Sequence, residues 1–295
     1  MAQQQQQFIV TAASAAYGKS LLALLGSLNL NWPDHPPVRI YDIGLDAETI
    51  GLLRSEGLDI FPVPAFCPHW RRHFTWKIWC FNDVKADFFL WIDAGYVVLE
   101  PLWEAFSFMD KTGFFTVPNY HLLDWEASSQ ACLGCGLSPD YRIGKRTFAG
   151  GLMGFKRTPV NIGLLQEALT IALHEPNIMA TETTHRHDQA ILSLLLYKYY
   201  KTPVFSDGLV FLGWKSPRQV PGQKVWAHRR RLLPEDQVYL ARHISTPGPI
   251  FVPRDPGPVV RHEPLGRRIT RRFAALLHGR KRTGPSEPYD GVRET

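Results

Sequence analysis

The stretch FFLWIDAG, residues 88–95, decides the fold. Its unbroken apolar run, residues 88–92, is typical of a strand that other elements cover on both faces. The run ends at Asp93, and Ala94 and Gly95 then let the backbone approach a ligand closely. The stretch therefore predicts a buried parallel strand that delivers one carboxylate to the edge of a sheet.

Strands and helices alternate on the N-terminal side of this stretch. Apolar runs at 8–13, 38–43 and 58–63 predict strands, and segments 18–28, 46–56 and 75–84 predict helices, the second capped by Asp46. Such alternation predicts βαβ units, a mainly parallel sheet and an α/β fold. Farther on, we expect strands at 114–117 and 151–155, helices at 160–174 and 188–200, and a loop-rich stretch at about 204–264.

The composition fits one folded domain with a tail. Hydrophobic residues make up 45% of the 295 residues, enough for a sizeable core. No run of about 18 apolar residues predicts a membrane span, and the first residues, MAQQQQQFIVTAAS, do not resemble a secretory signal. We therefore expect a cytoplasmic protein with a nucleotide-sugar-binding domain at residues 8–260 and a tail at 261–295.

The positive charge is concentrated in the tail. Residues 261–295 carry a net charge of +5, and the preceding 260 residues carry +1. A nearly neutral body argues against nucleic-acid binding, which needs a basic face. Apolar residues recur at helical spacing within 265–277, opposite several arginines. This predicts a basic amphipathic helix that either lies on anionic lipid at the inner face of a membrane or packs on the body before a disordered end.

Four cysteines are present, and two of them form the spacing Cys132-Leu-Gly-Cys135. Zinc sites and redox pairs both use this spacing. A second pair of the same kind is missing, because Cys67 and Cys80 are farther apart. Reduced thiols are therefore the favoured interpretation, and a zinc site is the alternative.

Three segments lie at the carboxyl ends of predicted strands: Thr11 and Ala12 with residues 13–14, Asp42, and Asp93 with Gly95. In an open parallel sheet, ligands bind beyond these ends, where the strand order reverses. The three segments therefore predict one nucleotide site. Asp93 suits a hard divalent cation or ribose hydroxyls there, and the alternative is that it caps a turn.

Three longer segments stand in the order of a known family. LWIDAGYVVLEPL at 90–102 resembles the metal-site strand of GT-A glycosyltransferases, FAGGLMGFKR at 148–157 is similar to their Asn-Ala-Gly segment, and HRHDQAILSLLLYKY at 185–199 resembles their Asp-Gln segment. The glycogenin-like members of this family read Leu-Asp-Ala-Asp at the metal-site strand. A further group, with a Trp-Leu-Asp-Ala-Gly signature, also shares VTAAS at 10–14, the pair Trp76–Lys77 and the His-Arg-x-Asp-Gln run. The resemblance covers residues 8–200 and implies a GT-A-like, Rossmann-like fold.

The resemblance also implies roles for individual residues. Asp188 and Gln189 would be catalytic, with Asp188 either the base of an inverting transfer or the group that positions the sugar in a retaining one. A helix cap is the alternative for Asp188. The donor would be contacted by His187, by Lys77 at the diphosphate, and by a sugar pocket formed of Ala149, Gly150 and Gly151. Arg71 and Arg72 are further cations for the diphosphate.

The sequence departs from the family pattern where a metal would bind. Gly95 replaces the second Asp, Phe148 replaces the Asn, and the late His-x-Gly-x-x-Lys segment is not recognisable after residue 205. Asp93 is the remaining ligand for Mn²⁺ or Mg²⁺, and His228 or His243 is a candidate substitute for the late one. The need for a divalent metal therefore stays open.

Two functions fit these observations. The first is a glycosyltransferase that moves a sugar from a nucleoside diphosphate to a carbohydrate, lipid-linked or protein acceptor, as in surface polysaccharide or glycan synthesis. The second is a non-catalytic nucleotide-sugar-binding module, which the missing second Asp favours. A nucleotidyltransferase is a third, weaker alternative, because TAASAAYGKS at 11–20 lacks a glycine-rich phosphate loop.

Overall fold

The computed structural model describes residues 5–179, 185–200, 212–213 and 222–245. These residues all belong to one compact unit, Met1–Arg254. The predicted tail at 261–295, the end of the predicted domain at 260 and most of the predicted loop region lie outside the described residues. No helix of the described part is long and apolar enough to span a membrane.

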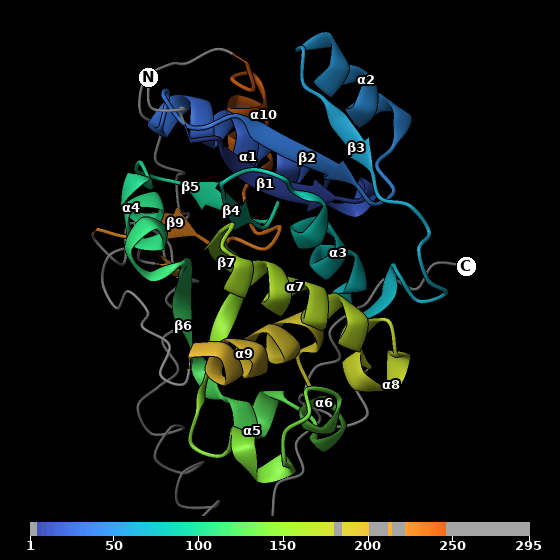
Figure 1. The fold of residues 1–295 in the computed structure, drawn as a ribbon. Coiled ribbons are helices and arrows are strands. Elements are labelled where there is room, and N and C mark those ends of the chain that lie inside the picture. The colour runs from blue at the N-terminus through green and yellow to red at the C-terminus, as the bar shows by residue number, and fades with distance from the viewer. Residues whose placement is uncertain (1–4, 180–184, 201–211, 214–221, 246–295) are drawn as a thin grey trace, which may run out of the picture. The chain divides into compact units, whose positions relative to one another are not determined.

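A six-stranded sheet forms the centre of the unit (Figure 1), in the order β3-β2-β1-β4-β7-β6. Its strands are β1 (Gln7–Ala13), β2 (Val38–Asp42), β3 (Ile60–Pro62), β4 (Phe88–Ile92), β6 (Phe114–Leu122) and β7 (Arg146–Lys156). The first four are parallel, and β7 runs antiparallel to both β4 and β6. The predicted α/β class and mainly parallel sheet are confirmed.

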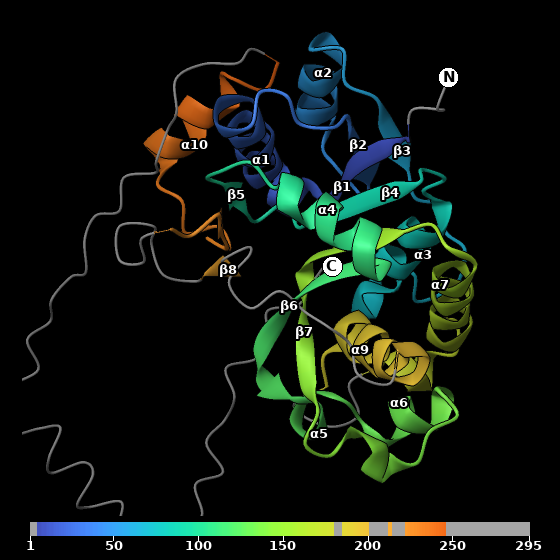
Figure 2. The same ribbon diagram turned by 60° about the vertical axis from the view of Figure 1, so that its left-hand side comes forward.

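Helices cover both faces of the sheet (Figures 1 and 2). Alternate residues of β4 explain this, because Phe89 and Trp91 join one buried cluster while Leu90 and Ile92 join another. The first cluster lies under α3 (Thr75–Asp83), α7 (Pro159–Ala172) and α9 (His187–Tyr200), and the other face carries α1 (Gly18–Asn31), α2 (Ala47–Ser55) and α4 (Trp103–Thr112). Asp46 caps α2, as predicted, by accepting from the Thr49 N–H at 2.7 Å.

Smaller elements complete the unit. α5 (Leu123–Glu126), α6 (Ser129–Gly134) and the 3₁₀ helix η3 (Pro139–Arg142) join β6 to β7, and α8 (Glu175–Ile178) follows α7. Two further 3₁₀ helices are η1 (Ala15–Tyr17) and η2 (Arg72–Phe74). A second sheet has the order β5-β9-β8, formed by β5 (Val97–Val98), β9 (Val225–Trp226) and β8 (Leu212–Gly213). α10 (Pro234–Ala241) packs on α1 (Figure 2).

The register places the carboxyl ends of the parallel strands at one edge. Val10 pairs with Trp91 and Ala13 pairs with Asp42, so Asp93 lies level with Ala12. The antiparallel strand β7 then passes this edge, because Ile92 pairs with Leu152. The edge predicted to hold the ligand is thus lined by β7 as well as by the parallel strands.

Candidate functional site

Asp93 lies directly after β4, at the edge of the sheet, and its side chain is 36% exposed. Its backbone N–H donates to the Gly151 carbonyl at 2.9 Å. Its Oδ1 accepts two hydrogen bonds, from the Trp91 indole at 2.7 Å and from the Lys77 ammonium at 2.9 Å. The carboxylate is therefore held in one orientation while part of it remains open to solvent.

Lys77 is the cation at the centre of the site. Its side chain is 4% exposed, and its Nζ lies 2.9 Å from Asp93 Oδ1 and 3.6 Å from Asp188 Oδ2. The same Nζ donates to the Gly150 carbonyl at 3.3 Å. A solvated surface position, the usual one for a helical lysine, is ruled out. One ammonium group thus joins α3 to β4, β7 and α9.

Asp188 lies in the first turn of α9 and is 5% exposed. Burial raises the pKa of its carboxyl group, the nearby Lys77 ammonium lowers it, and Asp93 raises it. The 3.6 Å contact with Lys77 is an ion pair that exceeds hydrogen-bond length, and Oδ2 has no hydrogen-bond partner among the described residues. This buried carboxylate oxygen therefore has unused capacity to accept a hydrogen bond.

Gln189 connects α9 with two other elements. Its Oε1 accepts from the Gly150 N–H at 3.2 Å, and its Nε2 donates to Glu126 Oε2 at 2.6 Å. The neighbouring His187 is partly buried, and its Nδ1 lies 2.9 Å from the Ile178 carbonyl. The structure therefore brings Gln189 into the Lys77 network, and it places His187 toward α8.

Close packing in β7 requires a glycine at Gly151 and leaves little room at Gly150. A Cβ atom on Gly151 would lie 2.0 Å from the Tyr96 hydroxyl and 2.6 Å from Asp93 Oδ2. A Cβ atom on Gly150 would lie 3.3 Å from the Gln189 Cβ. Together with the partly buried Ala149 next to it, this segment forms the surface that faces Asp93 and α9.

A segment from the C-terminal part completes the site. The Arg229 N–H donates to the Gly95 carbonyl at 3.1 Å, and the Arg230 guanidinium lies 5.0 Å from the centre of the Tyr17 ring. His228 is 1% exposed, and within the described part of the chain neither of its ring nitrogens has a hydrogen-bond partner. Burial lowers its pKa to about 4, so the ring is neutral at neutral pH.

The residues predicted at the ends of β1 and β2 are less directly placed for binding. Thr11 is fully buried in β1, and Ala12 is 6% exposed. Asp42 Oδ1 accepts from the Gly44 and Leu45 N–H groups at 2.7 and 2.6 Å. In this structure Asp42 therefore holds the loop that follows β2.

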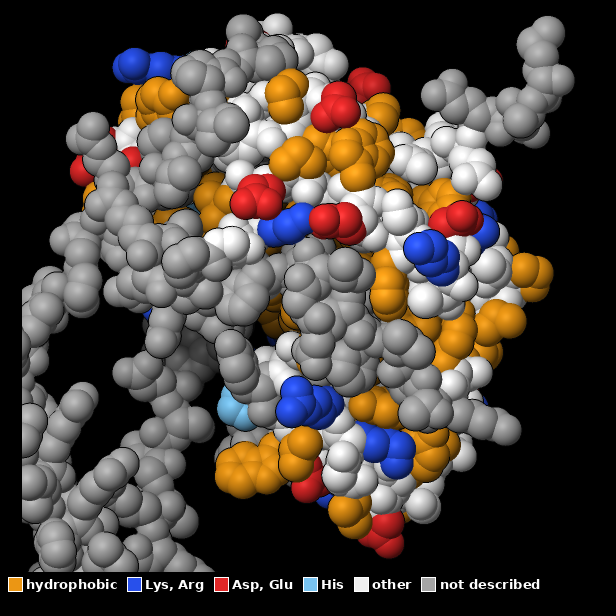
Figure 3. Space-filling view, turned by 90° about the vertical axis from the view of Figure 1, so that its left-hand side faces the viewer, with side chains coloured by type: hydrophobic (Ala, Val, Ile, Leu, Met, Phe, Trp, Pro, Cys, Tyr) orange, Lys and Arg blue, Asp and Glu red, His pale blue; other side chains and the backbone are white. Residues whose placement is uncertain are grey.

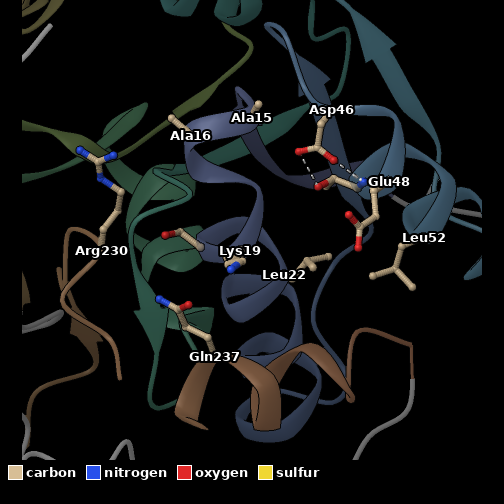
Figure 4. Close-up of a pocket in the computed structure, with 11 residues that line it drawn as sticks. Ala15, Ala16, Lys19, Leu22, Asp46, Glu48, Leu52, Arg230 and Gln237 are labelled. Carbon is tan, nitrogen blue, oxygen red and sulfur yellow. Dashed lines mark hydrogen bonds between the residues drawn. The ribbon is translucent and has the colours of Figure 1, made fainter. Parts of the chain in front are cut away.

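A separate pocket of about 460 Å³ lies between the starts of α1 and α2 and α10 (Figure 4). Lys19, Arg230 and Gln237 line one side, and Asp46 and Glu48 line the other. Arg230 is thus shared between this pocket and the Tyr17 contact described above.

The donor set at Asp93 fits a divalent metal poorly. Within the described part of the chain, no three His, Cys, Asp or Glu side chains are arranged to hold one. Asp93 Oδ1 is already occupied by an ammonium and an indole N–H, and Gly95 supplies no second carboxylate. Cys132 and Cys135 are buried thiols, and burial raises the pKa of Cys135 to about 12.

Charges of both signs are interspersed on the face shown in Figure 3, where the described residues are visible. Lys, Arg, Asp and Glu side chains alternate there instead of forming one basic stripe. This matches the small net charge of the body.

Two parts of the site, Glu126 and the Arg229–Arg230 segment, were not predicted from the sequence. Glu126 follows one exposed tryptophan in a four-residue helix, where no periodicity singles it out. The stretch KVWAHRRR at 224–231 carries a visible signal, a histidine followed by three arginines. Its proximity to Gly95 depends on pairing between β5 and β9, which are far apart in the chain.

No family profile matches this sequence, and no curated protein matches it either. Solved structures that match include a bifunctional glycosyltransferase, WbbM, with 14% identity and a TM-score of 0.47 over 72% of this chain and 40% of that one. An active-site mutant of LgtC matches with 13% identity and a TM-score of 0.47 over 91% of this chain and 95% of that one.

The glycosyltransferase GlyE of Streptococcus pneumoniae TIGR4 matches with 18% identity and a TM-score of 0.40, over 68% of this chain and 45% of that one. This chain therefore spans less than half of WbbM and of GlyE. These likenesses are distant, with identities of 13–18% and TM-scores of 0.40–0.47.

Proposed function

We propose that this protein transfers a sugar from a nucleoside diphosphate to a hydroxyl group of an acceptor. The observation that carries the proposal is the buried Lys77 ammonium between Asp93 and Asp188, beside the glycine pair of β7 and at the carboxyl edge of the sheet. In a site of this kind the ammonium fixes the positions of the two carboxylates, and nearby arginines supply positive charge for a departing diphosphate. The site also offers two carboxylates to sugar and acceptor hydroxyl groups.

Each residue of the site has its own role in the proposed transfer. The solvent-open part of Asp93 accepts hydrogen bonds from hydroxyl groups of the donor, and Lys77 holds Asp93 and Asp188 in place. Arg229 and Arg230, next to Gly95 and Tyr17, supply further cationic donors on the nucleotide side. The C–O bond between the sugar and the diphosphate breaks, and a bond to the acceptor oxygen forms.

Asp188 serves either the acceptor or the sugar. Its Oδ2, which no described residue contacts by a hydrogen bond, is able to take the acceptor proton in an inverting transfer, and its raised pKa makes it a stronger base than an ordinary carboxylate. In a retaining transfer the same carboxylate would instead orient the donor sugar. The anomeric configuration of the product, measured by NMR, separates the two.

A non-catalytic binding module is the second candidate, and Gly95 in place of a second carboxylate favours it. A thermal-shift panel of UDP-, GDP- and ADP-linked hexoses, followed by donor hydrolysis assays, distinguishes the candidates. A ligand at a hundredfold excess over its dissociation constant stabilises the folded state by about 2.7 kcal/mol. Turnover that Asp93→Ala abolishes supports transfer, and binding without turnover by the wild type supports the module.

We also propose a cytoplasmic protein whose basic tail, within 265–282, binds the anionic inner face of a membrane. The sequence pattern of the tail supports this, because its apolar and basic residues alternate at helical spacing. Deleting 265–282 should abolish sedimentation with phosphatidylserine vesicles. Undiminished sedimentation of the deletion variant would refute the tether.

A further inference from the structure

Glu126 is a buried carboxylate whose oxygens all face donors from other elements. It is 3% exposed, and its Oε2 accepts from Gln189 Nε2 at 2.6 Å and from Asn119 Nδ2 at 3.4 Å. Its Oε1 lies 3.3 Å from Arg186 Nε, and its carbonyl accepts from the Arg186 N–H at 2.9 Å. These contacts fix Glu126 between β6 and the start of α9.

The carboxylate decides which way the Gln189 amide points. A side-chain amide presents an acceptor at one end and a donor at the other, and its two orientations are nearly equal in shape. An ionised carboxylate only accepts, so Glu126 requires the NH₂ end. The amide oxygen is then left for the Gly150 N–H, from which it accepts at 3.2 Å.

Hydrogen bonds connect the Gln189 amide, through Gly150, to Lys77 at the centre of the site. The Gly150 carbonyl accepts from Lys77 at 3.3 Å, so Glu126, Gln189, Gly150 and Lys77 form one chain of hydrogen bonds. Chains of this kind rigidify a site when every member is satisfied. Glu126, which does not contact Lys77 directly, thereby acts on its ammonium group through two intermediate residues.

We propose that Glu126 is a positioning residue for sugar transfer, which orients the Gln189 amide and through it places Gly150 and Lys77. The inference deepens the proposed function and rests on it. A group displaced by about 1 Å costs an enzyme on the order of a hundredfold in rate, so loss of this orientation should be visible in turnover.

An exchange of the two residues tests the proposal. Gln189→Glu alone sets two carboxylates against each other, whereas Glu126→Gln/Gln189→Glu restores a donor facing an acceptor, because the amide introduced at position 126 would donate to the carboxylate introduced at position 189. The new carboxylate would still accept from the Gly150 N–H. Gln166→Glu, the same chemical change on the exposed side of α7, is the matched control.

The single variant should also acquire a pH dependence. Two carboxylates in contact retain one proton to a higher pH than an isolated carboxyl group does, and the protonated partner donates as the amide did. Arg186 lies 3.3 Å from Glu126, and Lys77 is connected to Gln189 through Gly150. His185, His187 and Asp188 are neighbours of Gln189 in the sequence.

We expect Gln189→Glu to lose about 10- to 100-fold in donor turnover at pH 8 and to recover part of it at pH 5.5, relative to wild type at each pH. Both ends of the Gln189 amide contact the protein, at Gly150 and Glu126, so in this proposal Gln189 acts by positioning and not on the substrate. The exchanged double variant should therefore recover turnover at both values, and the control should match wild type. A double variant no better than Gln189→Glu, or a single variant whose relative loss does not change with pH, would overturn the proposal.

Melting temperatures and UDP affinity of the same variants separate this proposal from the proposed function. A wild type that hydrolyses none of the UDP-, GDP- or ADP-linked hexoses would remove sugar transfer and the catalytic meaning of Glu126 together. With an active wild type, rescue of stability by the double variant but not of turnover would assign Glu126 a purely structural role and overturn the inference.

Discussion

Lys77→Met should destabilise the fold in a way that depends on pH. Methionine keeps most of the buried stem but removes the charge next to Asp188, which is 7% exposed on its side chain, at 3.6 Å. Two unit charges at that distance attract by about 5 kcal/mol at an effective dielectric constant of 20. Breaking a buried pair by removing one partner costs about 3–5 kcal/mol. Loss of the contact between Lys77 and Asp93 adds little to this cost, because solvent and the Trp91 indole still contact the Asp93 carboxylate.

The pH dependence follows from the raised pKa of Asp188. A carboxyl group whose pKa is higher in the folded state stabilises that state below its unfolded pKa and loses this contribution as pH rises through the folded value. Without Lys77 the pKa rises further, so the deficit of Lys77→Met relative to wild type should grow by up to about 1.4 kcal/mol per pH unit as pH increases. Replacing the carboxylate as well, in Lys77→Met/Asp188→Asn, should remove this slope.

Urea denaturation at pH 5, 6, 7 and 8 measures these differences. Lys156→Met is the matched control, because its ion pair with Asp110 has side chains 31% and 58% exposed, and pairs of that kind contribute about 0–1 kcal/mol. An equal loss of unfolding free energy in the two variants would refute the stabilising role of the buried Lys77–Asp188 pair. A loss in Lys77→Met that is the same at every pH would refute it as well.

Three further predictions follow from single residues. Gly151→Ala should lower the free energy of unfolding by about 1–3 kcal/mol and weaken donor binding, because its Cβ would lie 2.0 Å from the Tyr96 hydroxyl. Gly51→Ala, with no described atom within 4 Å of its Cβ, should raise the free energy of unfolding by up to about 1 kcal/mol. Urea midpoints in the opposite order would contradict this. Burial lowers the pKa of His228 from 6.5 to about 4, so the free energy of unfolding of the wild type should fall by about 3 kcal/mol as pH falls from 6.5 to 4. His228→Gln should lack that loss of stability in thermal melts. EDTA should leave UDP affinity essentially unchanged in titration calorimetry, because Asp93 Oδ1 already accepts from a cation; a loss restored by Mn²⁺ would count against it.

The sequence predicts the parallel half of the fold because its signals are local. An unbroken apolar run marks β4, and capping residues such as Asp46 mark helix starts. The position of Asp93 at the edge of the sheet follows directly, because the residue that comes after a buried parallel strand lies at the carboxyl edge of the sheet. These inferences needed no contact between distant parts of the chain.

The remainder of the site depends on distant contacts. The antiparallel course of β7 and the burial of Lys77 arise from pairing with β4 and from the approach of α9, and neither leaves a periodic pattern. Motif resemblance, rather than physical reasoning from the residues, is what singled out Lys77 and Gln189. Neither motif resemblance nor physical reasoning identified Glu126, because in the sequence a glutamate in a four-residue helix looks the same as a surface residue.

The hydrogen bond between Arg229 and Gly95 bears on biosynthesis. The sheet acquires its last strand once β7 has emerged from the ribosome, yet the wall beside Gly95 arrives much later, with β9 and the residues after it. Closing so long a loop is slow relative to local structure formation. The side of the candidate site that Arg229 forms is therefore completed only after the segment that contains β9 has been made.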